Sequence, residues 1–147
     1  MKLVKHILKT KGYDVYSTTM DATVFDAIKL MSDRGVGALL VIESGKLVGI
    51  ISERDYTRKV ILKGKSSKET PVKEIMTAPV IYTTADEPID TCMAVMTDRR
   101  IRHLPVLEDG KVTGVISIGD LVKAIIADQK NWIRELESHV LKHTSIV

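Results

Sequence analysis

A duplicated stretch constrains the fold of this chain more than any other feature. The run Gly49-Ile50-Ile51-Ser52-Glu53-Arg54-Asp55 recurs as Gly114-Val115-Ile116-Ser117-Ile118-Gly119-Asp120, offset by 65 positions as counted from Asp55 to Asp120. The two copies stay in register without a gap from positions 15 and 80 to positions 61 and 126. Each run is typical of an apolar strand that enters a helix, with a serine at the junction. We therefore expect two copies of one folding unit.

The hydrophobic periodicity predicts the order strand, helix, strand, strand, helix in each copy. In the first copy, we expect strands at 13–18, 38–42 and 47–51, a helix between Thr23 and Gly35, and a second helix at 52–63. In the second copy, we expect a helical turn at 71–76, strands at 80–83, 104–108 and 112–117, a helix from Pro88, and a last helix from Gly119. Gly45 should supply a positive φ in the first hairpin.

The duplication divides the chain into five predicted segments. These are an N-terminal helix at 1–11, the first repeat at 12–64, a polar linker at 65–70, the second repeat at 71–127 and a helical extension at 128–147. A unit of this size is too small to hold a core alone, so the two should pack face to face about a pseudo-two-fold axis. The predicted class is α/β (α+β), with a pair of clefts between the repeats.

The last helix is expected to continue beyond the repeat. After Gly119 there is neither proline nor glycine as far as His143, and Trp132, Ile133, Leu136 and Val140 continue an apolar stripe. A large exposed apolar surface usually marks an interface. We therefore expect a homodimer through the helices and this extension.

Composition and charge exclude several classes of protein for this chain. The net charge of +3 comes from evenly spread charges, so nucleic-acid binding is not expected. The single cysteine, Cys92, excludes an internal disulfide, and the apolar run at 1–11 is too short for a membrane span. A cytoplasmic protein without membrane contact is expected. His139 and His143 have metal-ligand spacing but no evident third ligand, so no metal site is expected.

The repeated Ser-x-x-Asp junction suits a ribose phosphate. Free N–H groups at a helix start attract an anion, and the carboxylates of Asp55 and Asp120 could accept from vicinal hydroxyls. Gly49 and Gly114 would let a flat base or a neighbouring backbone approach the strand closely. The same spacing is also a helix capping box, so the residues alone leave both interpretations open.

Several motifs together resemble a known family. The duplicated pattern, closed in each copy by Gly-x-x-Ser-x-x-Asp, resembles a tandem pair of cystathionine-β-synthase (CBS) domains, the Bateman module. Residues 36–42 and 101–107 match the family's hydrophobic-x-x-Leu-Pro-Val-hydrophobic strand, and Glu74-Ile75-Met76-Thr77 matches its entry to the second domain. Leu40 replaces the usual proline. The resemblance covers about residues 12–126.

This resemblance implies a regulatory module without catalysis or a catalytic cofactor. An adenosine ligand such as AMP, ADP, ATP, NAD(H) or S-adenosylmethionine would bind in two clefts and signal to an unknown effector protein. The first cleft would comprise Ser52, Arg54, Asp55, Thr77, Ile81, Ile101, Arg102 and His103. The second would comprise Gly12, Tyr16, Val36, Gly37, Ala38, Ser117 and Asp120.

The two clefts should prefer different ligands. Arg102 and His103 of the first correspond to Gly37 and Ala38 of the second, so the first favours a polyphosphate or dinucleotide and the second a monophosphate. The adjacent pair 99–100 is expected to be a solvated helix end.

Two functions of other classes remain as alternatives. A nucleotide-processing enzyme could use Asp55, Asp120 or His103, although neither a P-loop nor a nucleophile–base pair is apparent. A scaffold or nucleic-acid-binding regulator would bind no small ligand.

Overall fold

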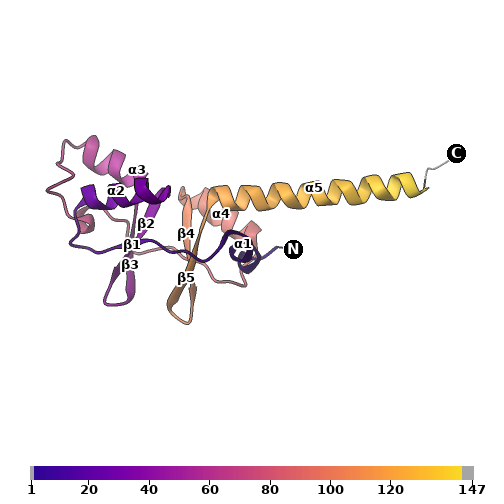
Figure 1. Ribbon diagram of the computed structural model, residues 1–147, viewed down its shortest axis with the longest axis horizontal. Coiled ribbons are helices and arrows are strands. Elements are labelled where there is room, and N and C mark those ends of the chain that lie inside the picture. Colours follow the sequence, from indigo (N-terminus) through magenta and orange to yellow (C-terminus); the bar gives the residue numbers. More distant parts are fainter. Residues whose placement is uncertain (1, 144–147) are drawn as a thin grey trace.

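The structure is a computed structural model that describes residues 2–143, with side chains described as far as residue 140. Two β-hairpins stand side by side, helices pack along them, and the C-terminal helix α5 (Ile118–His143) projects far beyond the second repeat (Figure 1). The predicted α/β class with two repeats is confirmed. Positions 144–147 of the predicted extension, and Met1, lie outside the described residues.

The first repeat contains a three-stranded sheet and two helical segments. Its elements are β1 (Ser17–Thr18), α2 (Val24–Arg34), β2 (Ala38–Glu43), β3 (Lys46–Ser52), α3 (Glu53–Tyr56) and the π-helical turn η1 (Thr57–Ile61). β2 pairs in parallel with β1 and antiparallel with β3. As predicted, Thr23 caps α2, and the helix ends at Gly35 with φ 66°. The predicted helix at 52–63 is instead one α-helical turn followed by η1.

The second repeat repeats this hairpin and ends in α5. Its elements are the 3-10 turn η2 (Val72–Glu74), α4 (Ile89–Arg99), β4 (His103–Glu108), β5 (Lys111–Ser117) and α5. β4 and β5 are antiparallel, and the tight turn at Asp109 and Gly110 has positive φ at both residues. Ser44 and Gly45 do the same in the first hairpin. The predicted hairpins are therefore confirmed.

The strand predicted at 80–83 is wrong, because only Thr83 forms a bridge, to Val106. In the first repeat, the Leu40 N–H donates to the Tyr16 carbonyl at 3.1 Å. The equivalent position in the second repeat is Pro105, which has no N–H to donate. The strand predicted at 13–18 is likewise shortened to β1.

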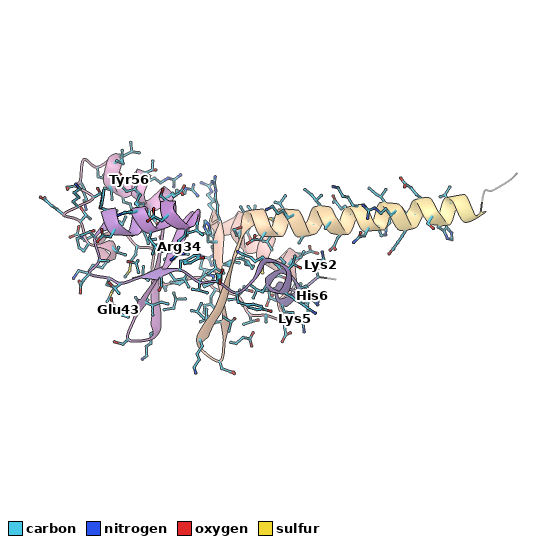
Figure 2. The ribbon with its side chains drawn as sticks, viewed as in Figure 1. Lys2, Lys5, His6, Arg34, Glu43 and Tyr56 are labelled. Atoms are coloured by element: carbon cyan, nitrogen blue, oxygen red, sulfur yellow. The ribbon has the colours of Figure 1, made fainter. Side chains whose placement is uncertain are left out.

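Each repeat packs against the segment that precedes the other repeat in the sequence, and we call these two the exchanged segments. Helix α1 (Val4–Lys11), on which Lys5 is labelled in Figure 2, places Leu8 in the core of the second repeat. Lys5 of this helix pairs with Asp86 at 3.1 Å. Conversely, Val72 packs in the core of the first repeat, although the sequence analysis placed segment 71–76 in the second. The core of each repeat therefore contains residues from the segment that precedes the other repeat in the sequence.

The repeated glycines accommodate these exchanged segments. A Cβ on Gly49 would lie 2.6 Å from Met76 Sδ, and one on Gly114 would lie 2.7 Å from Leu8 Cδ2. The expected close approach is therefore made by a neighbouring segment and not by a flat base, because a side chain already fills the space beside each strand. The glycines instead permit close packing between each hairpin and its exchanged segment.

Candidate functional site

Two cavities lie between the repeats, and each contains one Ser-x-x-Asp junction. The larger, cavity 1, has a volume of about 620 Å³, and the smaller, cavity 2, has about 380 Å³. Gly37, Ile50 and His103 line both cavities. The two cavities are therefore neighbours that share a wall.

The first junction is both a helix cap and part of the wall of cavity 1. Ser52 Oγ accepts from Asp55 N at 3.2 Å, and Asp55 Oδ2 accepts from Ser52 N at 3.0 Å. The other carboxylate oxygen, Oδ1, accepts from Thr77 Oγ1 at 3.3 Å and pairs with Lys59 Nζ at 3.1 Å. Thr77 and Lys59 also line the cavity. The capping interpretation and the cavity interpretation are thus compatible, because Asp55 uses a different oxygen for each role.

The second junction is held by a lysine from the exchanged helix. Asp120 Oδ2 accepts from Ser117 N at 2.8 Å and from Lys11 Nζ at 2.6 Å. Lys11 also donates to the Val115 carbonyl at 2.7 Å. Burial opposes ionisation of Asp120, but the hydrogen bonds from Lys11 and Ser117 outweigh it and lower the pKa of this carboxyl. The carboxylate is therefore charged at neutral pH.

The two cavities differ in charge. Cavity 1 has five arginines and one lysine against two carboxylates, whereas cavity 2 has one lysine against two carboxylates. The basic residues of cavity 1 are Arg54, Arg58, Lys59, Arg99, Arg100 and Arg102. The charged residues of cavity 2 are Lys11, Asp14 and Asp120. Cavity 1 is therefore the stronger attractor of anions.

His103 separates the cavities at the start of β4. Burial lowers the pKa of its imidazole, and the charges of Lys11 and Arg102 lower it further against the opposing effect of Asp120. The imidazole is therefore neutral at neutral pH and can donate with one nitrogen and accept with the other. A Cβ on Gly37 would lie 3.5 Å from His103 Cε1, so the two residues face each other closely.

The structure brings together each set of residues that the sequence analysis grouped. Cavity 1 is lined by Ser52, Arg54, Asp55, Thr77, Ile81, Ile101, Arg102 and His103. Cavity 2 is lined by Gly12, Tyr16, Val36, Gly37, Ala38, Ser117 and Asp120.

Three basic residues that line the cavities were not predicted from the sequence. Arg58 and Lys59 follow Asp55 by one helical turn, so helical spacing could have identified them. Lys11 gave no such signal, because it reaches cavity 2 from the exchanged helix. Arg99 and Arg100, expected to be a solvated helix end, are exposed but line cavity 1.

Tyr56 and Cys92 lie away from the two cavities. Tyr56 packs against the first core rather than lining a cavity (Figure 2). Cys92 is buried, and this burial raises the pKa of its thiol. Within the described residues, no group of three His, Cys, Asp or Glu could hold a metal ion, and the side chain of His143 lies outside them. No helix between positions 2 and 143 is long and apolar enough to cross a membrane.

Comparison with known proteins identifies the family. The model of the CBS domain matches residues 4–61 and 72–127. The chain belongs to the CBS domain family. These two matches confirm the tandem CBS arrangement that the repeats predicted.

Relatives of this CBS pair are found among both sequences and solved structures. The mitochondrial CBS domain-containing protein CBSX3 of Arabidopsis thaliana is 40% identical over 146 residues, which are 93% of this chain and 71% of the relative. A CBS-domain protein from Burkholderia ambifaria has a structure with TM-score 0.85 and 54% identity, covering 87% of this chain and 96% of its own. The CBS domain pair of protein MJ0100, solved with 5′-methylthioadenosine and S-adenosyl-L-methionine, has TM-score 0.78 and 28% identity, covering 87% of this chain and 98% of its own.

Proposed function

We propose that this CBS pair is a regulatory module that binds an adenine nucleotide, with cavity 1 as the principal site. The observation that carries the proposal is the pairing of a cap-anchored carboxylate, Asp55, with a cluster of arginines in one cavity. A volume of about 620 Å³ lies within the range of small-molecule sites, roughly 300–1,000 Å³. The adenosine compounds bound to the MJ0100 pair support this ligand class.

The nucleotide would contact cavity 1 through three groups of residues. Asp55 Oδ1 would accept from the ribose hydroxyls in place of Lys59, which would then be free to contact a phosphate. Ile81 and Ile101 would provide apolar contact for the base. The guanidinium groups of Arg54 and Arg102, with His103 beside them, would bind the phosphates, since arginine contacts phosphate with two N–H groups.

The charge difference between the cavities favours different ligands. Cavity 1 suits a polyphosphate or dinucleotide such as ATP or NAD(H), and cavity 2 suits a monophosphate such as AMP. In cavity 2 the ribose would compete with Lys11 for Asp120. Because Gly37 and His103 border both sites, occupation of one would alter the other, and this change in packing would be the signal to an effector protein.

The proposed module has no catalysis of its own and works as a homodimer. One oxygen of the Asp55 carboxylate is used in the helix cap, where Ser52 Oγ donates to Asp55 Oδ2 at 3.1 Å. A cytoplasmic location stays a prediction, since one relative is named as mitochondrial. No catalytic cofactor is proposed.

Thermal unfolding with a ligand panel tests the proposal. The purified protein would be unfolded with AMP, ADP, ATP, NAD, NADH or S-adenosylmethionine, and each ligand would afterwards be recovered and checked by chromatography. A ligand at 100 times its dissociation constant stabilises the folded state by about 2.7 kcal/mol. We expect stabilisation by at least one ligand that is recovered unchanged. No stabilisation by any ligand would contradict nucleotide binding, and recovered product would support the enzyme alternative.

A further inference from the structure

Helix α5 exposes a stripe of apolar residues at heptad spacing. The members of this α5 stripe, which are between 43% and 53% exposed, are Val122, Ile126, Ile133, Leu136 and Val140. Together with Gln129 they recur at alternating separations of four and three residues, the repeat of a coiled coil. An apolar stripe this regular on a helix of 26 residues indicates a helical partner.

The stripe is separate from the face that α5 uses within its own chain. Leu121 is fully buried in the core of the second repeat, and Ile118 and Ile125 pack against the same core. The stripe begins on the adjoining face with Val122 and Ile126, and then follows the part of α5 that projects beyond the repeats (Figure 1). The partner helix can therefore lie along α5 without displacing the core.

The residue types along the stripe indicate the kind of partner. The a positions are Ile126, Ile133 and Val140, all β-branched, and the d positions are Val122, Gln129 and Leu136. β-Branched residues at a with leucine at d favour parallel two-stranded coiled coils, and a polar residue within the seam fixes the register. A helix with this pattern is complementary to a second copy of itself.

We propose that two copies of this chain pair through α5 as a parallel coiled coil in register from Val122 to Val140. This seam spans about 28 Å at 1.5 Å per residue. The inference rests on the proposed homodimer, whose contact surface and orientation it specifies, and it does not depend on nucleotide binding. Trp132 borders the seam at a g position, where it faces the partner's Glu137.

Gln129 determines the orientation. In the parallel pair it meets the partner's Gln129, and the two amides can hydrogen-bond to each other. In an antiparallel pair that covers the same stripe, centred between Gln129 and Ile133, Gln129 would face the partner's Ile133 rather than a second amide. That pair would gain a contact between Lys123 and the partner's Glu137, but exposed ion pairs contribute little, whereas a buried amide without a partner is costly.

Light scattering with matched variants tests the surface. We expect the wild-type chain to have twice its 16.3 kDa mass and Leu136→Glu to have the monomer mass. Ser138→Glu adds the same charge at an f position on the opposite face and should remain dimeric. A monomeric wild type would overturn both the homodimer and the seam. A dimer that Leu136→Glu leaves intact would overturn the seam alone.

A cysteine at the polar layer tests the orientation. Gln129→Cys should form a disulfide-linked dimer under mild oxidation, because the parallel seam places the two introduced thiols in contact. In the antiparallel pair that covers the whole stripe they would be offset by about 6 Å along the helix in addition to the width of the seam, which is beyond the reach of a disulfide. The wild-type chain is the control, since its Cys92 is buried. Failure to cross-link would overturn the parallel seam.

Nucleotide binding, measured on the same proteins, should be unchanged by Leu136→Glu, which separates this test from that of the nucleotide site.

Discussion

Replacing Gly114 by alanine should destabilise the second repeat, because Leu8 occupies the space that the new methyl group needs. The added Cβ would lie 2.7 Å from Leu8 Cδ2 and 3.2 Å from Cδ1, whereas contacting carbon atoms lie about 3.5–4.0 Å apart. Leu8 is 2% exposed, so its methyl groups would have to shift within the core, and overpacking should cost about 1–3 kcal/mol. Each kcal/mol lowers the melting temperature by about 2–4 °C in a domain of this size.

Urea and thermal unfolding, followed by circular dichroism, would measure this cost. The control is Gly119→Ala in α5, where the added Cβ meets only Ser117 Oγ, at 3.6 Å. This change should be neutral or stabilise by about 0.4–1 kcal/mol. The double variant Leu8→Ala/Gly114→Ala should be more stable than the sum of the single effects predicts, because the two residues are in contact. If Gly114→Ala keeps full stability but loses nucleotide binding, the glycine serves a ligand and the packing explanation is wrong.

Three further predictions concern the cavities and the extension. The pKa of Asp120 is lower in the folded state, so this carboxylate stabilises the fold above its unfolded pKa, and that stability is lost as the pH falls through the folded pKa. Lys11→Met should therefore lower the free energy of unfolding by about 1 kcal/mol at neutral pH and by little in acid. Urea unfolding at pH 7 and pH 3 checks this, and an equal cost at both values would exclude the ion pair as the cause. Arg102→Ala should weaken ATP binding about tenfold and adenosine binding far less, and Lys111→Ala serves as an exposed control. If calorimetry shows that Arg102→Ala weakens ATP and adenosine binding equally, Arg102 does not contact a phosphate. Removing the chain after Asp128 should give a protein that still binds nucleotide, because every cavity residue precedes that point, but that is a monomer by light scattering. A truncated protein that is still a dimer would contradict this prediction.

Local sequence signals predicted much of the fold. The hairpins follow from alternating apolar residues around Ser44-Gly45 and Asp109-Gly110, where both turn residues take positive φ. The strand at 80–83 failed because its pairing depends on Pro105, which is distant in the sequence and lacks the needed N–H. The exchange of leading segments could not be predicted, since an amphipathic helix such as α1 shows which face is buried but not which repeat buries it.

In the candidate site, too, the features set by local sequence were predicted and most of those set by contacts between distant segments were not. The duplicated Ser-x-x-Asp junction predicted two clefts, and family resemblance supplied the residues across them. The lysines paired with the carboxylates, Lys59 and Lys11, were missed. Lys59 follows Asp55 at i,i+4 and could have been identified from helical spacing. The contact of Lys11 depends on the exchanged helix α1, whose packing partner does not follow from local periodicity. The sequence also left open what approaches the repeated glycines, because their neighbours Met76 and Leu8 come from distant segments.

Calorimetric titration of ATP into the wild-type chain and into Asp55→Ala is the most direct test of the central claim that cavity 1 binds an adenine nucleotide. Asp21→Ala, which removes an exposed carboxylate outside both cavities, is the control, and the unfolding of each variant shows whether the helix cap at Ser52 was lost. We predict that ATP binds the wild type and the control alike, and that Asp55→Ala weakens binding at least about tenfold while remaining folded. Equal ATP affinity in all three proteins, or no binding to the wild type, would contradict the account and leave Ser52 and Asp55 as a helix cap alone.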